Sequence, residues 1–190
     1  MSTLAENYLE STRKQFAYYQ QLGERTMEQL SDAQLAATPG TEDNSVARIV
    51  DHLHGNMRSR FTHFWTSDGE KEWRQRDAEF DTAYVDRETV FLKWQEGWAA
   101  VWTVLDALEP RQLTELVYIR GQGHTALEAV NRQLAHYAYH IGQIVYLGKQ
   151  WRGADWVSLS IPKGQSAEFN AEKAKAGRQR GHYTDEFLKK

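Results

Sequence analysis

Four long stretches of the chain place apolar or aromatic side chains three and four residues apart, which is the spacing of one buried face of an α-helix. These stretches are residues 4–30, 45–65, 87–109 and 125–149. No stretch shows the convincing apolar–polar alternation that is typical of a half-buried strand. The pattern predicts an all-α protein in which four amphipathic helices bury their apolar faces against one another as a four-helix bundle.

Residues that commonly cap the N-terminus of a helix occur where these stretches begin. Capping residues elsewhere indicate short helices that link the long ones. A serine, threonine or aspartate in this position accepts hydrogen bonds from the free N–H groups of the first turn. The caps are Ser31 with Gln34 for a short helix, Asn44 or Ser45 for the second long helix, Asp86 for the third, and Thr125 with Glu128 for the fourth. The stretch PRQL at residues 110–113 opens another short helix, whereas the polar residues 66–85 have no period and predict a long loop.

The hydrophobic stripes also predict which side chains point inward. In the second long helix they are Val46, Val50, Leu53, Met57, Phe61 and Phe64, and in the third they are Val90, Trp94, Trp98, Val101 and Leu105. The pattern weakens after the fourth helix. We therefore expect a bundle domain over residues 1–153, followed over residues 154–190 by an extended segment that packs on the bundle and by a mobile polar tail.

The amino-acid composition limits which partners the protein can be expected to bind and which chemistry it can carry out. The net charge of −3 does not favour nucleic acid or an anionic membrane as the main partner, and no apolar run approaches the length of a membrane span. The N-terminal stretch MSTLAENYLE lacks the features of a signal peptide. The absence of cysteine excludes disulfides and cysteine metal sites, and predicts a cytoplasmic protein. Seven tryptophans are many for one core, so we expect some of them in a homodimer interface, with the core and a pocket wall as the alternative.

Two histidines stand out on the fourth helix. His136 and His140 lie four residues apart on the inner side of that helix, so their imidazoles are stacked one turn apart. Neutral imidazoles with this spacing can converge on one metal ion. The alternative is a pair of hydrogen-bonded core histidines, which the spacing alone does not exclude.

A third metal ligand must come from another helix, and the second long helix offers three histidines. His52 lies on the flank beside the apolar stripe, and His54 turns toward the opposite flank. His63 is eleven residues beyond His52, roughly 16 Å along the helix axis, and so cannot share a site with it. His52 is therefore the best partner. No Glu is followed three residues later by His, so the di-iron pattern of helical bundles is absent from the sequence.

Several stretches of the chain resemble an uncharacterised branch of the DinB-like superfamily. They are HLHGNMRSRF, DGEKEWRQRDAEF, HYAYHIGQIVYLGKQW and LSIPKGQS, and the resemblance covers nearly the whole chain. It implies an up-down-down-up four-helix bundle with a divalent metal held by His52, His136 and His140. Characterised members of the superfamily include metal-dependent thiol transferases and an isomerase that use low-molecular-weight thiols.

These observations lead to three hypotheses about function. The first is a metal-dependent enzyme acting on a small-molecule substrate, such as a transferase that uses a low-molecular-weight thiol. The second is a metal-dependent hydrolase of a small substrate, and the third is a non-catalytic, stress-related metal-binding protein. Histidine-only sites suit zinc, nickel or iron, and also copper. Asn56 and Gln143 could orient a ligand or a bound water in such a site, or could be ordinary solvated or core amides.

Overall fold

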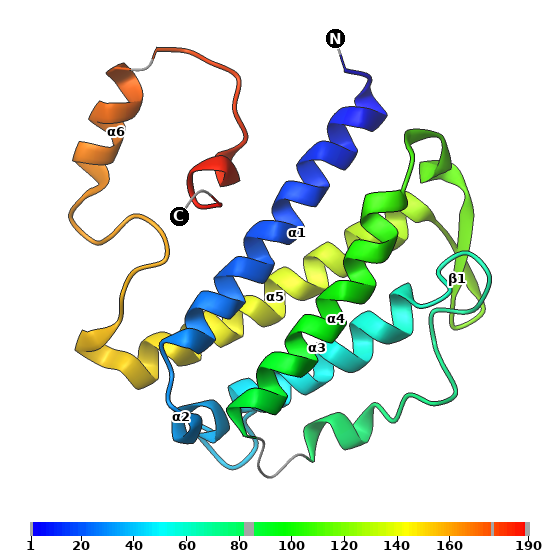
Figure 1. The fold of residues 1–190 in the computed structure, drawn as a ribbon, viewed down its shortest axis with the longest axis horizontal. Helices are drawn as coiled ribbons and strands as arrows, with labels where there is room; N and C mark the ends of the chain where they lie inside the picture. Colours follow the sequence, from blue (N-terminus) through cyan, green and yellow to red (C-terminus); the bar gives the residue numbers. More distant parts are fainter. Residues whose placement is uncertain (1, 82–85, 176, 189–190) are drawn as a thin grey trace.

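The computed structural model describes residues 2–81, 86–175 and 177–188, and the fold is mostly helical. The chain forms four long helices, which lie side by side (Figure 1). They are α1 (Leu4–Glu28), α3 (Val46–Phe61), α4 (Arg87–Ala107) and α5 (Ala126–Arg152). The shorter helical elements are α2 (Asp32–Ala36), η1 (Asp77–Phe80), η2 (Pro110–Thr114), η3 (Gly153–Asp155), α6 (Ser166–Lys175) and η4 (Tyr183–Glu186).

The directions of the long helices follow from the lengths of their connections. The chain descends through α1, ascends through α3 and α4, and descends again through α5 in the view of Figure 1. Helices that run in the same direction need a long connection, and residues 62–86 join α3 to the start of α4. Helix α3 packs most extensively on α4, α1 packs on α5, and α3 also contacts α5. The last of these contacts brings the predicted histidines together.

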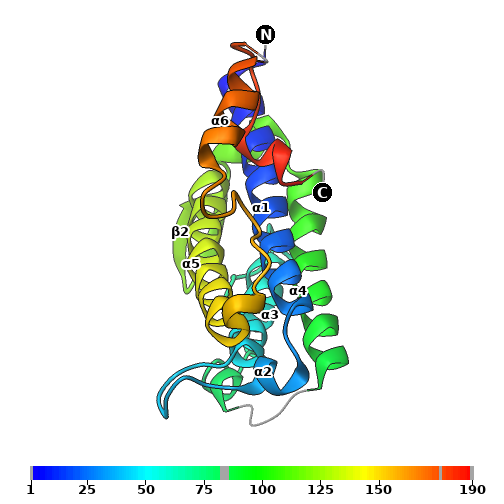
Figure 2. The same cartoon turned by 90° about the vertical axis from the view of Figure 1, so that its left-hand side faces the viewer.

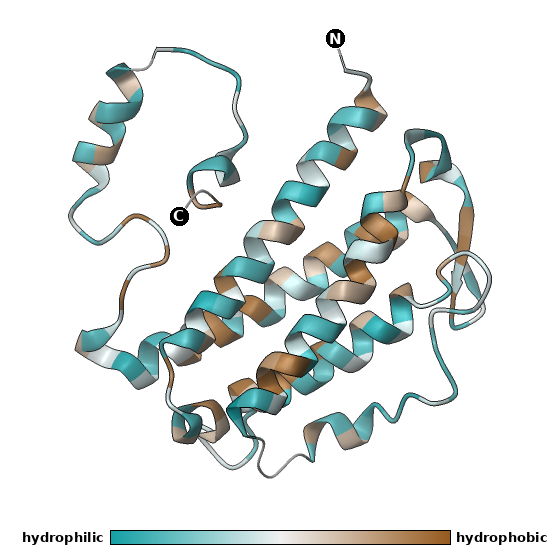
Figure 3. Cartoon of the chain, viewed as in Figure 1, coloured by the Kyte–Doolittle hydropathy of each residue, from teal (hydrophilic) through white to brown (hydrophobic). Residues whose placement is uncertain are grey.

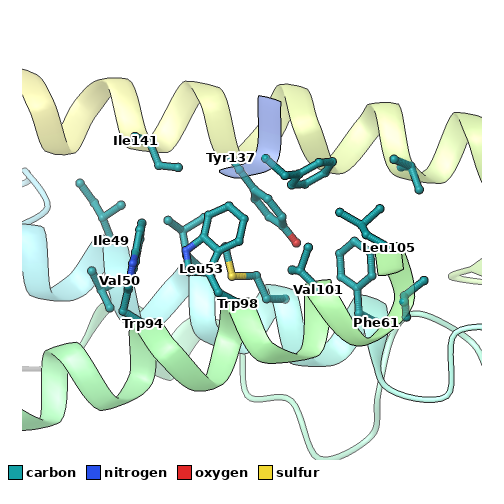
Figure 4. Close-up of a cluster of buried hydrophobic side chains, with 14 of the residues drawn as sticks. Ile49, Val50, Leu53, Phe61, Trp94, Trp98, Val101, Leu105, Tyr137 and Ile141 are labelled. Carbon is teal, nitrogen blue, oxygen red and sulfur yellow. The ribbon is translucent and has the colours of Figure 1, made fainter. Parts of the chain in front are cut away.

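The core is built from the predicted stripes, and their burial is confirmed. Every residue that was expected to point inward from the second and third long helices is buried. Large aromatic side chains fill the centre: Trp98 of α4 contacts both Trp94 of the same helix and Tyr137 of α5 (Figure 4). The ring centroid of Trp98 lies 5.9 Å from that of Tyr137 and 6.3 Å from that of Phe16, in edge-to-face arrangements that aromatic pairs prefer.

Tryptophans outside this core show graded exposure. Trp65 and Trp73 are exposed, whereas Trp102, Trp151 and Trp156 are half-buried. The homodimer expected from the number of tryptophans stays a prediction. No helix in the described parts of the chain has the length and hydrophobicity to cross a lipid bilayer.

A small β-hairpin is the main departure from the predicted all-α fold. Strands β1 (Leu116–Ile119) and β2 (Gln122–Thr125) pair in antiparallel register, with Ile119 opposite Gln122. The turn between them consists of Arg120 and Gly121, whose φ angles of 57° and 73° suit a tight hairpin. Four residues per strand are too few to show an alternating pattern, which is why the sequence did not predict them.

Two polar regions also contain structure that has no hydrophobic period. Within the predicted loop 66–85, the 3₁₀-helix η1 packs on α3; residues 82–85 lie outside the described residues. Near the C-terminus, α6 is largely hydrophilic and stands apart from the long helices (Figure 3), whereas η4 contacts α1. Lys14 of α1 and Asp185 of η4 form an ion pair of 2.9 Å. The division of the chain at residue 153 remains a prediction.

Candidate metal centre

The three predicted histidines converge between α3 and α5. His52 comes from the middle of α3, and His136 and His140 come from successive turns of α5. One ring nitrogen of each histidine lies within 4.8 Å of the others. Leu53 and Ile141, the neighbours of His52 and His140 in sequence, are fully buried in the adjoining core (Figure 4). The predicted juxtaposition of the three histidines is confirmed.

The spacing of the ring nitrogens fits a single metal ion. Nε2 of His52 lies 3.3 Å from Nε2 of His136. Two imidazole nitrogens bound to one tetrahedral zinc ion at the usual bond length would lie roughly 3.4 Å apart. The ring centroid of His140 is 4.8 Å from that of His52 and 4.6 Å from that of His136. One pair of nitrogens thus already has this spacing, and the third histidine has a ring nitrogen within 4.8 Å of both.

Two of the histidines are oriented by hydrogen bonds to their outer nitrogens. Nδ1 of His52 lies 2.9 Å from Oε2 of Glu79, and Nδ1 of His140 lies 2.8 Å from Oε1 of Gln143. Because both partner atoms accept hydrogen bonds, each Nδ1 carries a proton, which leaves Nε2 as the nitrogen available to a metal ion. Such outer hydrogen bonds are the usual means by which proteins fix the tautomer and orientation of metal-binding histidines.

Glu79 is a buried carboxylate that the sequence analysis did not identify. It comes from η1, and its oxygens also accept hydrogen bonds from Arg74: 2.8 Å from Nε to Oε1 and 3.0 Å from Nη2 to Oε2. Burial opposes ionisation of Glu79, but the hydrogen bonds from His52 and Arg74 outweigh it and lower the pKa of Glu79 below its ordinary value. Phe80, the next residue, stacks on the ring of His52 at 4.9 Å. The segment read as a loop thus forms one wall of the centre.

A glycine on α3 explains how Glu79 comes so close. A Cβ atom on Gly55 would lie under 3.0 Å from the Glu79 carboxylate, so any other residue at this position would displace that carboxylate. Gly55 stands three residues after His52, inside a helix, where glycine costs roughly 1 kcal/mol relative to alanine. A glycine in this position is the sequence signal that could have indicated a close neighbour on this side of α3.

The electrostatic environment keeps the histidines of α5 neutral. Burial, together with the neighbouring His140 and His52, lowers the pKa of His136 to about 3. Burial likewise lowers the pKa of His140 to about 4, although its hydrogen bond to Gln143 acts in the opposite direction. Both imidazoles are therefore in the unprotonated form at neutral pH, which is the form that binds metal.

The two amide candidates have different surroundings. Gln143 bonds His140 as described, and its Nε2 donates to Oη of Tyr139 at 3.2 Å. Asn56 is buried, and its Oδ1 accepts a hydrogen bond from Oη of Tyr137 at 3.2 Å. Gln143 therefore orients a histidine of the triad, whereas the observed partner of Asn56 is a core tyrosine.

The remaining histidines lie elsewhere. His54 is half-buried against α4, with Nε2 3.0 Å from Oε2 of Glu96, and His63 is exposed at the end of α3. His124 lies in β2, and Nε2 of His182 is 3.0 Å from Oγ of Ser11 on α1. Within the described residues, His52, His136 and His140 form the one cluster with metal-ligand spacing.

Fold and site together define a mostly helical protein with an inward-facing three-histidine centre. The chain belongs to the family described as "Protein of unknown function (DUF1572)", whose match covers residues 3–165. That range includes all three histidines and Glu79. No curated protein and no solved structure shows a significant similarity to the chain.

Proposed function

We propose that this protein binds one divalent metal ion through Nε2 of His52, His136 and His140. The observation that carries the proposal is the 3.3 Å approach of two Nε2 atoms, combined with outer hydrogen bonds that leave Nε2 as the free nitrogen of His52 and His140. We further propose that the four long helices form a DinB-like bundle of up-down-down-up type. The helix directions and the long connection over residues 62–86 support this assignment.

The proposed activity is transfer of a low-molecular-weight thiol to an electrophilic substrate. Three protein ligands leave coordination positions open, and a divalent ion bound there would lower the pKa of a small thiol or polarise a carbonyl. The thiol sulfur would form a bond to an electrophilic carbon, while its proton passes to solvent and the leaving group departs with its electron pair. Because the chain has no cysteine, the sulfur has to come from a small molecule.

The side chains of the protein have positioning roles in this proposal. Glu79 and Gln143 hold the rings of His52 and His140, and Arg74 keeps Glu79 ionised. His136 and His140 are only half-buried, which leaves room for a small molecule to approach from outside. A metal site that served stability alone would be expected to close all its positions with protein ligands.

The arrangement of Glu79 favours thiol transfer over hydrolysis. Hydrolysis by a metal-bound water usually requires a carboxylate or imidazole that is free to accept a proton. Both oxygens of Glu79 already accept hydrogen bonds, and the lowered pKa of this group makes it a weak base. We therefore rank hydrolysis second among the candidate reactions.

Cobalt substitution tests the proposal. The full chain, purified in the presence of zinc or nickel, is expected to retain about one metal ion. After exchange for cobalt, its absorption spectrum should be that of a four- or five-coordinate ion. Titration with 2-mercaptoethanol should then add a sulfur-to-cobalt charge-transfer band. A site that binds cobalt but changes its spectrum only with pH would favour hydrolysis. A spectrum insensitive to both would indicate a closed, structural metal, and failure to bind any divalent ion would refute the proposed function.

A further inference from the structure

A groove lies immediately beside the histidine centre. It has a volume of about 600 Å³ and runs between the connection at residues 39–44 and the outer face of α5. Figure 2 shows this connection projecting from the base of the fold near the end of α5. The volume lies within the range of small-molecule sites. Gln143 and Tyr139 line the groove and also contact His140: Gln143 bonds its Nδ1, and the ring of Tyr139 lies 4.6 Å away.

The floor of the groove contains a glycine that no contact within the protein explains. The four long helices contain five glycines. At Gly23, Gly55, Gly97 and Gly148 a Cβ atom would lie under 3.0 Å from a neighbouring side chain, so packing requires glycine there. At Gly142 a Cβ atom would meet nothing within 4 Å. Glycine in a helix interior is unfavourable relative to alanine, so an unexplained one marks a place where the surface is kept bare.

Two exposed tyrosines stand on either side of this bare position. Tyr139 precedes Gly142 by three residues and Tyr146 follows it by four, so all three lie on one face of α5. The tyrosines are 62 % and 70 % exposed, and both line the groove. Exposed aromatic rings flanking a glycine form a slot into which a small ligand can fit.

The residues on the opposite wall of the groove indicate the charge of the ligand that it would bind. Glu42 and Asp43 line it from the connection between α2 and α3, and no basic residue is among the described residues that line the groove. Arg48 donates to the backbone carbonyl oxygen of Asp43 at 3.4 Å. Two acidic residues and two tyrosines that line the same groove favour a cation, because both the carboxylates and the ring faces attract it.

We propose that this groove binds a small molecule that carries a primary ammonium group. The ammonium group would lie near Glu42 and Asp43, and the carbon skeleton would cross Gly142 between Tyr139 and Tyr146. That this molecule is a substrate of the adjacent centre rests on the function proposed above. The binding itself requires only the groove and can be measured without metal.

The test compares three probes of similar shape on the metal-free full chain. Phenethylamine, 2-phenylethanol and 3-phenylpropionate are titrated while NMR signals of the ligand and the protein are followed. Phenethylamine should bind, the alcohol should bind more weakly, and the carboxylate should not bind. Gly142→Phe, which fills the slot, should weaken phenethylamine binding by about tenfold or more. Gly142→Ala is the graded comparison: its methyl group meets no protein atom within 4 Å, so the fold should be unchanged, and binding should weaken by less than in Gly142→Phe, because the ligand crosses this position.

A second set of variants checks the charge and the aromatic walls. The pair Glu42→Gln and Asp43→Asn should weaken phenethylamine binding and remove most of its sensitivity to salt. Tyr146→Ala should weaken binding by about threefold, the size of an exposed cation–π contact. These substitutions are at exposed positions, so circular dichroism should show an unchanged fold.

Three results would overturn the proposal. They are the absence of phenethylamine binding, equal binding by Gly142→Phe and the wild type, and equal binding of the amine and the carboxylate. If Gly142→Phe instead changes the oligomeric state and no amine binds, the groove is a contact between copies of the chain. Metal titration of the same samples keeps the two proposals separate. Amine binding without metal binding would refute only the proposed function, and metal binding without amine binding would refute only the groove.

Discussion

Helix α3 has two sides that differ in their chemistry. Toward α4 it presents buried apolar side chains such as Leu53, which lies beside Trp98 (Figure 4), and Met57, whose sulfur adjoins Gly97 of α4. Toward α5 and η1 it presents His52, which is only 4 % exposed and is surrounded by polar and ionic groups.

The two sides contribute unequally to the stability of the fold. Burying a leucine-sized side chain contributes roughly 1.5–3 kcal/mol to folding. Burying an ion pair such as that of Arg74 and Glu79 contributes little or nothing net, because desolvation offsets the attraction. The apolar side therefore stabilises the fold, and the polar side uses part of that stability to hold a binding site in place.

Removal of a predicted ligand should have the largest effect, and it should act on metal binding alone. His136→Ala and His140→Ala should each abolish most metal binding while the fold persists, since neither side chain belongs to the apolar core. His54→Ala and His63→Ala serve as controls, because these residues lie outside the cluster. Metal content after gentle purification is the measurement. Full metal content in either ligand variant would remove that residue from the site.

The opposite side of α3 is tested by Leu53→Ala. Leu53 is completely buried, so its truncation should lower the free energy of unfolding by about 2–5 kcal/mol, measured by urea denaturation. Metal affinity should fall as well, although no ligand is lost, because this packing places His52 opposite α5. If the variant is clearly destabilised but binds metal with unchanged affinity, in competition with a chelator, the packing of α3 does not position the site.

Removing the carboxylate behind His52 should have an intermediate effect. Glu79→Gln should lower metal affinity by about 10- to 100-fold, since the group that orients His52 and makes it more basic is neutralised. The single variant also leaves the guanidinium of Arg74 buried without a counter-charge and should be less stable. The double variant Arg74→Gln with Glu79→Gln removes both charges and should recover part of the stability but not the affinity. Unchanged affinity in both variants would show that Glu79 has no role in the site.

Removing the metal should show in one experiment that the apolar side of α3, and not the metal site, carries most of the stability. Because the apolar stripes carry most of the stability, chelation should leave the helical circular dichroism unchanged. The metal-bound form should nevertheless melt at a higher temperature, since the ion binds the folded state. Loss of helicity after chelation would mean that the metal is structural.

The smallest expected effect is the pH dependence of the metal-free protein. The pKa of His136 is lowered to about 3 and that of His140 to about 4, so the unfolded chain binds more protons than the folded one below about pH 6.5. The free energy of unfolding should therefore decrease as the pH falls from 7 to 5, and this loss of stability should be absent well above pH 6.5, where both states are neutral at these histidines. Urea denaturation of the wild type and of the double variant His136→Gln with His140→Gln checks this. Equal slopes in the two proteins would contradict the lowered pKa values.

Local sequence determined the four long helices and the pairing of two of the three histidines. Thr125 and Glu128 form the predicted capping box at the start of α5, with Thr125 N 2.8 Å from the Glu128 carboxylate. His136 and His140 are held together by one turn of helix, so their pairing follows from spacing alone. The burial of the apolar stripes was predictable for the same reason, because helical periodicity is a property of neighbouring residues.

Only the tertiary structure showed that a carboxylate from another segment belongs to the site. Glu79 meets His52 across 27 residues of sequence, from a polar segment whose pattern predicted only a loop. The groove depends likewise on residues 39–44 coming to lie against the bare surface of Gly142. Contacts of this kind depend on where the packing of the helices places a segment. A segment without hydrophobic periodicity gives no indication of that place in its own sequence. Gly55 is a partial exception, since the absence of a side chain inside a helix indicates a close neighbour but does not identify it.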